Sequence, residues 1–304
     1  MFRKFKYHIL LHLIILMWGF TGILGKLINL PPLPIVWYRV LIAAASLGIV
    51  LPLMERSLKL KSPREFFMLA LVGIVVMLHW VTFYMAIDLS TASLGILCLS
   101  TTTIHVSWLE PLVMKRRLSW TEVVMGLVVI YGIYFVSEDF SAQDYIALAY
   151  GLVSALMAAI FSVMNGKMAQ TMAPSKITFY EMVIGGVFLT IILLFRGELN
   201  PELFQLSTED ILWLLFLGLL CTSFAFLVTV ELTKRLGAFT VSLSINMEPV
   251  YTILLAIVIL NENKIMGTQF YIGSFIIVAV VLANAIIKRY MRRKLLKNTH
   301  LNAE

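Results

Sequence analysis

The stretch that decides the fold runs from Leu243 to Glu262 and reads Leu-Ser-Ile-Asn-Met-Glu-Pro-Val-Tyr-Thr-Ile-Leu-Leu-Ala-Ile-Val-Ile-Leu-Asn-Glu. Extended back to Ala238, it is long and apolar enough to cross a bilayer, although Glu248 and Pro249 lie near its middle. An ionisable group at that depth costs about 2.5–3.5 kcal/mol and therefore marks a functional candidate. Proline removes a backbone donor and clashes with the carbonyl four residues earlier. The stretch predicts a membrane helix that kinks beside a carboxylate.

Other polar side chains gather around this carboxylate. On a continuous helix, Ser244, Glu248 and Tyr251 share one face, and Ser242 and Asn246 lie on an adjacent one. A helix that faced only lipid would have no use for these groups. We therefore expect this face to point into the protein.

The rest of the chain has the composition of a membrane protein. It has 304 residues, of which 60% are hydrophobic and 13% charged, and its mean hydropathy is +0.92. Apolar runs of about 20 residues recur, the length that a helix needs to cross a hydrocarbon core of about 30 Å. We expect an all-α membrane protein with ten transmembrane helices, at about 8–28, 33–54, 66–87, 89–112, 121–137, 145–166, 177–195, 211–232, 238–260 and 265–287.

The distribution of charge predicts the topology. The net charge of +7 is not spread evenly, because the outer loops hold only Arg196 and Lys264, and the spans only Lys26 and Arg39. This positive-inside bias predicts an N-in, C-in protein. We interpret the tail at 288–304 as a topological or lipid-head-group feature and not as a nucleic-acid arm. The expected cytoplasmic segments carry Arg3, Lys4, Lys6, Arg56, Lys59, Lys61, Arg64, Lys115, Arg116, Arg117, Lys167, Lys176, Lys234, Arg235, Lys288, Arg289, Arg292, Arg293, Lys294 and Lys297.

An internal repeat divides the chain into two halves. The residues of the first half recur in the second at an offset that drifts only from 141 to 147. Because each half holds five spans, an odd number, the halves must have opposite orientations, which makes an inverted repeat. The predicted domains are a first five-helix repeat at 8–137, a second at 145–287 and the basic tail. The matches are Gly25-Lys26 with Gly166-Lys167, Tyr38-Arg39 with Tyr180-Glu181, Gly73 with Gly218, and Gly126 with Gly273.

Several short motifs, in this order, resemble the drug/metabolite transporter superfamily, in its ten-helix bacterial branch with two tandem EamA-type domains. They are Trp18-Gly19, Arg39-Val-Leu-Ile-Ala, Met247-Glu248-Pro249-Val250, Asn261-Glu262 and Gly273. The resemblance covers residues 8 to 287. It implies a secondary transporter of the bacterial inner membrane, often an exporter of amino acids, other metabolites or toxic compounds, with a cavity between the halves.

The first half departs from this pattern. Where the second half has Glu248-Pro249, the repeat places Thr101-Thr102, and Glu110-Pro111 follows nearer the cytoplasmic end. We therefore do not expect the two halves to share one coupling chemistry.

Each candidate site residue has a functional and a structural interpretation. Glu248 either binds a transported proton or hydrogen-bonds a neighbouring helix end beside the kink at Pro249. His79 and His105 either relay protons or form interhelical hydrogen bonds, and we favour the second. Arg39 either holds a substrate carboxylate or, like Lys26, reaches toward the outer head groups.

The remaining candidates are aromatic and small polar residues of the spans. They could line a cavity or simply pack, and they are Trp18, Trp80, Tyr84, Thr101, Trp108, Asn165, Ser244, Asn246 and Tyr251. For Glu110, Glu181 and Glu231 we favour structural roles near the cytoplasmic ends, where water reaches them.

The expected function is transport of a small organic solute by alternating access. Proton coupling stays open, and the alternatives are an uncoupled facilitator of the same fold or a regulatory or scaffold subunit that transports nothing. We expect no enzyme, cofactor or metal site, because the His and Glu residues are isolated and the chain has no nucleotide or metal motif. Cys98 and Cys221 lie inside spans, so a structural disulfide is not expected. The expected partners are the solute, protons and the bilayer, and the oligomeric state is open.

Overall fold

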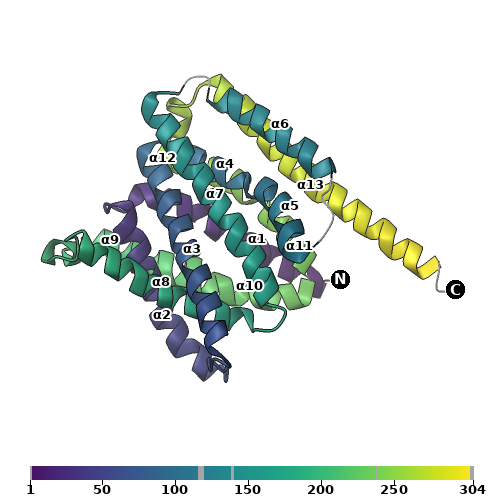
Figure 1. Ribbon diagram of the computed structural model, residues 1–304. Helices are drawn as coiled ribbons and strands as arrows, with labels where there is room; N and C mark the ends of the chain where they lie inside the picture. Colours follow the sequence, from purple (N-terminus) through teal and green to yellow (C-terminus); the bar gives the residue numbers. More distant parts are fainter. Residues whose placement is uncertain (1, 116–119, 138–139, 237, 302–304) are drawn as a thin grey trace.

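The computed structural model describes residues 2–115, 120–137, 140–236 and 238–301, and these residues form helices, turns and loops without a β-strand (Figure 1). Arg116, Arg117 and the end of the expected tail lie outside the described residues. The α-helices are α1 (Phe2–Leu27), α2 (Pro32–Leu53), α3 (Pro63–Leu89), α4 (Ala92–Ser100), α5 (Thr102–Met114), α6 (Trp120–Val136), α7 (Ala142–Met168), α8 (Pro174–Phe195), α9 (Thr208–Leu215), α10 (Ala225–Leu236), α11 (Ala238–Ile245), α12 (Glu248–Leu260) and α13 (Thr268–Leu301). A π-helix, η2 (Phe216–Phe224), joins α9 to α10, and η1 (Pro201–Phe204) and η3 (Glu262–Lys264) are 3₁₀ turns.

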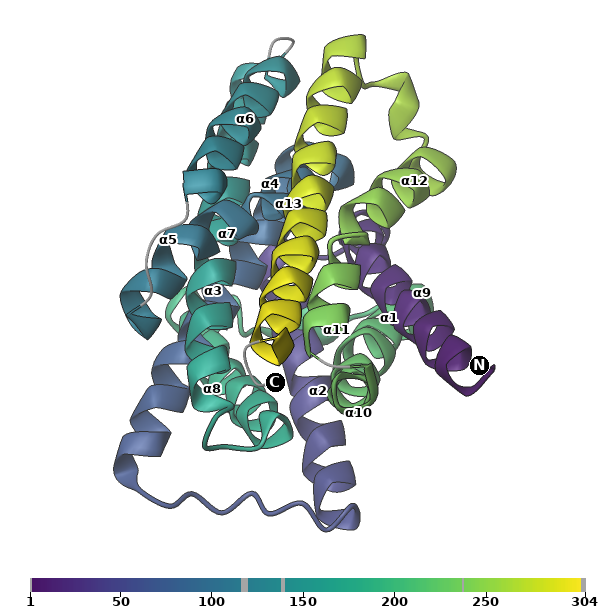
Figure 2. The same cartoon turned by 90° about the vertical axis from the view of Figure 1, so that its right-hand side faces the viewer.

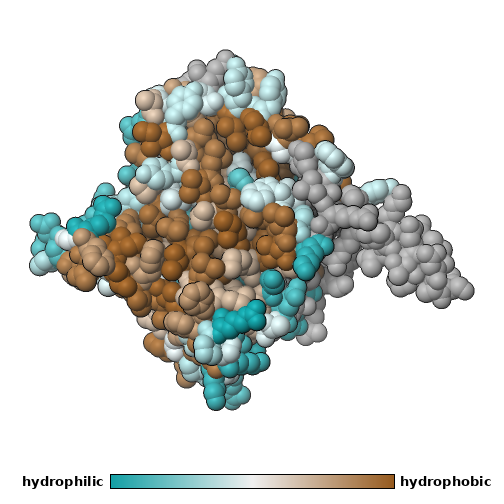
Figure 3. All heavy atoms as spheres, in the orientation of Figure 1, coloured by the Kyte–Doolittle hydropathy of each residue, from teal (hydrophilic) through white to brown (hydrophobic). Residues whose placement is uncertain are grey.

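In the described part of the chain, seven helical segments are long and apolar enough to cross a membrane. They are Lys6–Leu27, Pro32–Leu53, Pro63–Leu89, Ala92–Met114, Ala142–Met168, Pro174–Phe195 and Thr208–Thr233. Three shorter apolar helices cover Val124–Val136, Glu248–Leu260 and Thr268–Asn284. Figure 3 shows a largely hydrophobic surface over α3, α7 and α8, with hydrophilic residues gathered at the bottom and at the left tip of the view. The chain is a multi-pass membrane protein.

Two of the expected spans are broken helices. α11 ends at Ile245 and α12 begins at Glu248, and the two pieces run in different directions (Figure 2). Pro249 lies in the first turn of α12, where it has no N–H to donate to Ile245. The expectation that Ser244 and Glu248 share a face of one continuous helix is therefore wrong.

The first half is interrupted at the corresponding place, which the sequence did not predict. α4 ends at Ser100 and α5 begins at Thr102. The hydroxyl of Thr101 donates to the carbonyl of Cys98 at 2.6 Å, a local bond that competes with helix continuation. α5 and α12 both have 13 residues, and each is followed by a residue with positive φ, Lys115 at 55° and Asn261 at 54°.

A π-helix interrupts the eighth expected span. It covers Phe216–Phe224, and the hydroxyls of Thr222 and Ser223 donate to the carbonyls five residues earlier, at 2.8 and 3.1 Å. Such widened turns are frequent at functional sites. No residue type in this apolar segment distinguishes a π-turn from an α-turn, so the sequence predicted an ordinary helix.

Reciprocal contacts join the two halves. The hydroxyl of Tyr38 donates to the carbonyl of Leu203 at 2.9 Å, and that of Tyr180 donates to the carbonyl of Leu58 at 2.9 Å. Tyr38 and Tyr180 are 142 residues apart, and Leu58 and Leu203 are 145 apart, so the partners in one bond are the repeat equivalents of those in the other. Each half therefore holds the loop that follows the second helix of the other.

The glycines of the repeat make a second reciprocal pair. A Cβ on Gly218 would lie 2.6 Å from Cγ2 of Ile42, and a Cβ on Gly73 would lie 3.4 Å from the backbone of Glu181 and 3.5 Å from Ile184. Ile42 and Ile184 are themselves repeat equivalents, 142 residues apart. The third helical segment of each half therefore packs closely on the second helix of the other.

Equivalent helices of the two halves pack antiparallel. The indole N–H of Trp37 donates to Thr190 at 2.8 Å, at the start of α2 and the end of α8, whereas Gly48 near the end of α2 faces Phe179 near the start of α8. α6 and α13 also pack together (Figure 2), with Gly132 beside Ile277, and Val136 beside Gly273. The largest apolar core lies around the first pair, between α1, α2, α3, α8 and η2.

The glycine pair predicts an asymmetric response to alanine. We expect Gly218→Ala to destabilise the protein by about 1–3 kcal/mol, because the new methyl group overlaps the branched side chain of Ile42. Gly73→Ala should be close to neutral, because its nearest neighbours lie at ordinary van der Waals distance. Thermal unfolding of the purified variants measures the difference, and equal melting temperatures would contradict this packing.

Candidate functional site

Arg39 is buried between three helical segments. It is the eighth residue of α2 and 4% exposed. Its Nε donates to the hydroxyl of Thr222 in η2 at 2.9 Å, and its Cζ lies 3.9 Å from the centre of the Trp80 ring of α3. A guanidinium on an aromatic face is held by cation–π attraction, which grows when water is excluded. Arg39 is therefore a fixed positive charge inside the protein, and the interpretation that it reaches the outer head groups is wrong.

Two further sequence candidates tie α1 to the same region. The indole N–H of Trp18 donates to the carbonyl of Cys221 at 3.1 Å, a carbonyl of the π-helix. The hydroxyl of Tyr84 donates to the carbonyl of Thr21 at 3.3 Å and interacts electrostatically with Arg39. Trp18, Arg39 and Tyr84 therefore come together where α1, α2, α3 and η2 meet.

Glu248 reaches this region from α12. It is the first residue of that helix and partly exposed. A carboxylate at a helix N-terminus is favoured by the unpaired N–H groups there. The charge of Arg39 acts on Glu248 only at longer range, since no hydrogen bond or ion pair joins the two side chains. The site thus brings a fixed guanidinium of the first half and a carboxyl of the second into one region without an ion pair between them.

Close packing of α1 on α12 positions this carboxyl. A Cβ on Gly19 would lie 2.9 Å from the hydroxyl of Thr252 and 3.4 Å from the carbonyl of Glu248. Thr252 is fully buried, and its hydroxyl lies 3.1 Å from both the Gly19 and the Glu248 carbonyl. One turn along from Glu248, the Tyr251 hydroxyl lies 2.8 Å from Nδ1 of His12 on α1.

Other sequence candidates are satisfied by local partners. His79 is buried, and its Nδ1 lies 2.9 Å from the hydroxyl and 3.0 Å from the carbonyl of Ser154 on α7, the interhelical bond that we favoured. Ser244 donates to the carbonyl of Thr240 at 3.0 Å. His105 lies edge-on to Trp108 on its own helix, α5. Asn246 is partly buried in the break before α12.

The glutamates expected at the cytoplasmic ends do not share one environment. Glu231 is exposed and forms an ion pair with Arg235 at 2.8 Å. Glu110 is partly buried. Glu181 is only 4% exposed, so the expectation that water reaches it easily is wrong: α8 packs on α3 at Gly73 and covers it.

The π-helix residues of the site were missed by the sequence reasoning. Thr222 holds Arg39, and Ser223 bonds to Ser46 of α2 at 2.6 Å. The signal was the short polar run Cys221-Thr222-Ser223 inside an otherwise apolar segment. Small hydroxyl residues are common in membrane helices, so the run by itself did not stand out.

Glu262, the second residue of the Asn261-Glu262 motif, binds the start of a first-half helix. Its carboxylate is buried and accepts the backbone N–H groups of Ala92 at 2.7 Å and Ser93 at 3.1 Å. These are the first unpaired donors of α4, which a carboxylate satisfies well. Glu262 therefore fixes the turn after α12 to the broken helix of the first half.

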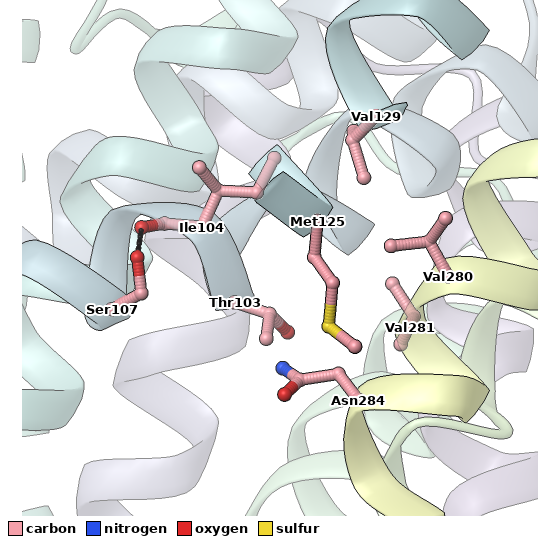
Figure 4. A pocket seen from close by; sticks show the side chains of 8 residues that line it. All are labelled: Thr103, Ile104, Ser107, Met125, Val129, Val280, Val281 and Asn284. Atoms are coloured by element: carbon pink, nitrogen blue, oxygen red, sulfur yellow. Dashed lines mark hydrogen bonds between the residues drawn. The ribbon is translucent and has the colours of Figure 1, made fainter. Parts of the chain in front are cut away.

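Two small cavities among the described residues are not lined by Glu248. The first has a volume of about 10 Å³, enough for about one water molecule, and lies between α5, α6 and α13 (Figure 4). Its polar lining residues are Thr103, Ser107 and Asn284. The second, of about 90 Å³, is lined by residues that include Ser90, Asp144 and Phe270. Within the described part of the chain, no three His, Cys, Asp or Glu residues lie close enough to hold a metal ion.

A polytopic helical bundle with buried polar groups at a junction of broken helices is the architecture of a membrane transporter. The model of the EamA-like transporter family matches residues 5–138 and 145–285. The chain belongs to this family, part of the drug/metabolite transporter superfamily, and has two tandem EamA domains. It is a transporter and not an enzyme.

Individual relatives agree with this assignment. An uncharacterized transporter of Archaeoglobus fulgidus is 26% identical over 282 residues, which cover 91% of this chain and 96% of the relative. An uncharacterized transporter of Clostridium kluyveri is 24% identical over 245 residues, which cover 75% and 78%. A solved crystal structure, whose description names no particular protein, is similar to this chain with a TM-score of 0.64 and 16% sequence identity. The match covers 94% of this chain and 98% of the other. At this identity the similarity concerns the fold alone.

Substitution of two threonines tests whether the hydrogen bond from Arg39 to Thr222 of η2 stabilises the protein. Thr222→Val keeps the side-chain shape but removes the acceptor of a buried charged donor, so we expect a loss of about 1–3 kcal/mol of stability. Thr233→Val is the matched control, because Thr233 makes only the intrahelical bond to Thr229 among the bonds that the structure describes. Melting temperatures of the purified variants should fall more for Thr222→Val. An equal fall would show that the bond to Arg39 contributes nothing.

Proposed function

We propose that this protein is a secondary transporter that moves a small organic solute across the bacterial inner membrane by alternating access, in the direction of export. Its two repeats, 8–137 and 145–287, are inverted relative to one another, and both chain ends face the cytoplasm. The antiparallel packing of α2 on α8 and of α6 on α13 supports inversion, because each is a pair of repeat equivalents. The tyrosine bonds to Leu203 and Leu58 support it as well.

The ten spans of this proposal are the seven long segments and the three shorter apolar helices. The shorter α12 completes a span when it is joined to α11 across the break. α6 and the apolar part of α13 then form the last span of each half and pack against each other. The basic end of α13 continues as helix beyond them, on the cytoplasmic side.

The opposite charges of Arg39 and Glu248, placed in one region by the two halves, carry the functional proposal. One charge belongs to the first half and the other to the second, so relative movement of the halves changes the distance between them. A proton on Glu248 removes that attraction, and deprotonation restores it. Glu248 is therefore the proposed coupling group, and Arg39 is its partner or holds an anionic part of the solute.

The solute would bind between the halves, beside the side chains of Arg39 and Glu248. Trp18 and Tyr84 supply aromatic walls there, and the break at Asn246 and Pro249 leaves backbone groups available for binding. The other proposed lining residues are His79, Thr101, His105, Ser244 and Tyr251. Binding of solute and proton then biases the equilibrium between inward-open and outward-open states.

An uncoupled facilitator is the second candidate. The observation in its favour is that the first half has no carboxyl at the equivalent break, where Thr101 and Thr102 stand. In this mechanism Glu248 is a structural group at the start of α12, and solute alone drives the transition.

Reconstitution distinguishes these mechanisms. Liposomes containing the native protein should accumulate at least one member of a metabolite panel when a proton gradient is imposed. Glu248→Gln should lose the acceleration by the gradient, because the amide cannot bind or release a proton, while solute exchange without a gradient persists. The readout is initial flux at several pH values.

Glu231→Gln is the matched control, since Glu231 is exposed and forms an ion pair with Arg235 on its own helix. Flux through the native protein that ignores pH would establish the uncoupled facilitator. If neither protein moves any solute, and Glu248→Gln leaves every transport phenotype of the cell unchanged, the chain is a regulatory or scaffold subunit.

A further inference from the structure

Another carboxyl group, that of Glu181, lies buried in the bundle on α8. Glu181 is the eighth residue of α8 and 4% exposed. Eight residues of helix place it about 12 Å from the start of α8, well inside the apolar part of the chain. A carboxylate in such surroundings needs either a cation or several hydrogen-bond donors.

The described part of the chain brings one hydrogen-bond donor to this carboxyl. The side-chain Nδ2 of Asn165 on α7 donates to Oε1 of Glu181 at 2.7 Å. The other end of the same amide, Oδ1 of Asn165, is buried and has no hydrogen-bond partner among the described residues. Two acceptor groups are therefore buried together without the donor that would satisfy them.

The charged groups described on the helices around α8 either have other partners or are exposed. On α8 itself, Lys176 bonds to the carbonyl of Lys59 and to Glu65 of α3. The helices packed against α8 are α2, α3, α7 and α10. Their charged and titratable groups nearest to this level are Arg39 bound to Thr222, His79 bound to Ser154, the exposed Lys167, and Glu231 paired with Arg235. Among the described side chains, no cation forms an ion pair with Glu181.

A proton on the Glu181 carboxyl would remove its unpaired charge and would supply the hydrogen-bond donor that Oδ1 of Asn165 lacks. A neutral carboxyl group has an O–H donor as well as a carbonyl acceptor, and a primary amide has an N–H donor and a carbonyl acceptor. The two can therefore bond to each other twice, with the amide N–H donating to one carboxyl oxygen and the carboxyl O–H donating to the amide oxygen. The first of these bonds is the one between Asn165 and Glu181, and the second would satisfy Oδ1 of Asn165.

We propose that Glu181 and Asn165 form a second proton-binding site, in which a proton on the Glu181 carboxyl is shared with the Asn165 amide. The site belongs to the second half alone, between α7 and α8. The repeat equivalent of Glu181 is Arg39, and each is the eighth residue of its helix. At this position one half therefore carries a fixed positive charge, and the other half carries a carboxyl group that is neutral when protonated. Loss of the proton would leave an unpaired charge beside α3 and would destabilise this packing of α8.

Proton binding is measurable without transport, although the inference rests on the proposed membrane transporter. Infrared difference spectra of the purified full-length protein in lipid nanodiscs, recorded during a pH titration, detect the C=O stretch of each neutral carboxyl. We expect one such band at neutral pH to be absent from Glu181→Gln and to shift in Asn165→Leu, because the leucine removes both hydrogen bonds. Glu231→Gln and Glu248→Gln should retain this band.

Glu181→Gln should fold normally, because its amide can pair with Asn165 in the same two-bond arrangement. Glu181→Ala should lower the melting temperature, and it shows whether the pair supports the packing. A carboxylate band in place of the acid band at neutral pH would overturn the proposal. So would a carboxylate band whose position changes on adding sodium, since this would identify a cation site. The spectra are independent of flux, so a protein that transports nothing can still confirm the site.

Discussion

The structure depends on one requirement, that every backbone and side-chain polar group inside a bilayer must find a partner in the protein. Continuous helices meet it automatically, and the interruptions of this chain do not. Side chains satisfy backbone groups at the interruptions or at the ends of the broken helices. Trp18 donates to a carbonyl of the π-helix, Glu262 accepts the first N–H groups of α4, and Thr252 bonds to the carbonyl of Glu248. Trp18 and Glu262 each reach a backbone group of the other half, so these bonds hold the two halves together.

The duplication explains both the regularity of the molecule and the place where it is broken. Tyr38 and Tyr180 keep the same contact in both halves, because each fixes a loop of the other half by a bond to a main-chain carbonyl. The residues that follow them have diverged to a base, Arg39, and an acid, Glu181. The breaks have diverged in the same manner, with Thr102 at the start of α5 and Glu248 at the start of α12. The structural contacts are therefore the same in both halves, whereas the charged groups differ between them.

Much of this architecture could be predicted, because span length and internal repetition are strong signals. The helices and the equivalence of Gly73 with Gly218 follow from apolar runs and from the ordered matches along the chain. The burial of Glu181 could not be predicted, since it depends on how closely α8 approaches α3. The same holds for Thr222, whose role requires the geometry of the π-helix. Sequence periodicity specifies the face on which a residue lies but not what packs against that face.

The central claim is that equivalent loops of the two halves lie on opposite sides of the membrane. Single-cysteine labelling tests it at the exposed positions Ser57, after α2, and Glu202, after α8, which are repeat equivalents. The native Cys98 and Cys221 are buried, so the native protein serves as the background. A membrane-impermeant thiol reagent should label Glu202→Cys in intact cells and Ser57→Cys only after permeabilisation. Labelling of both positions from the same side would contradict the inverted arrangement.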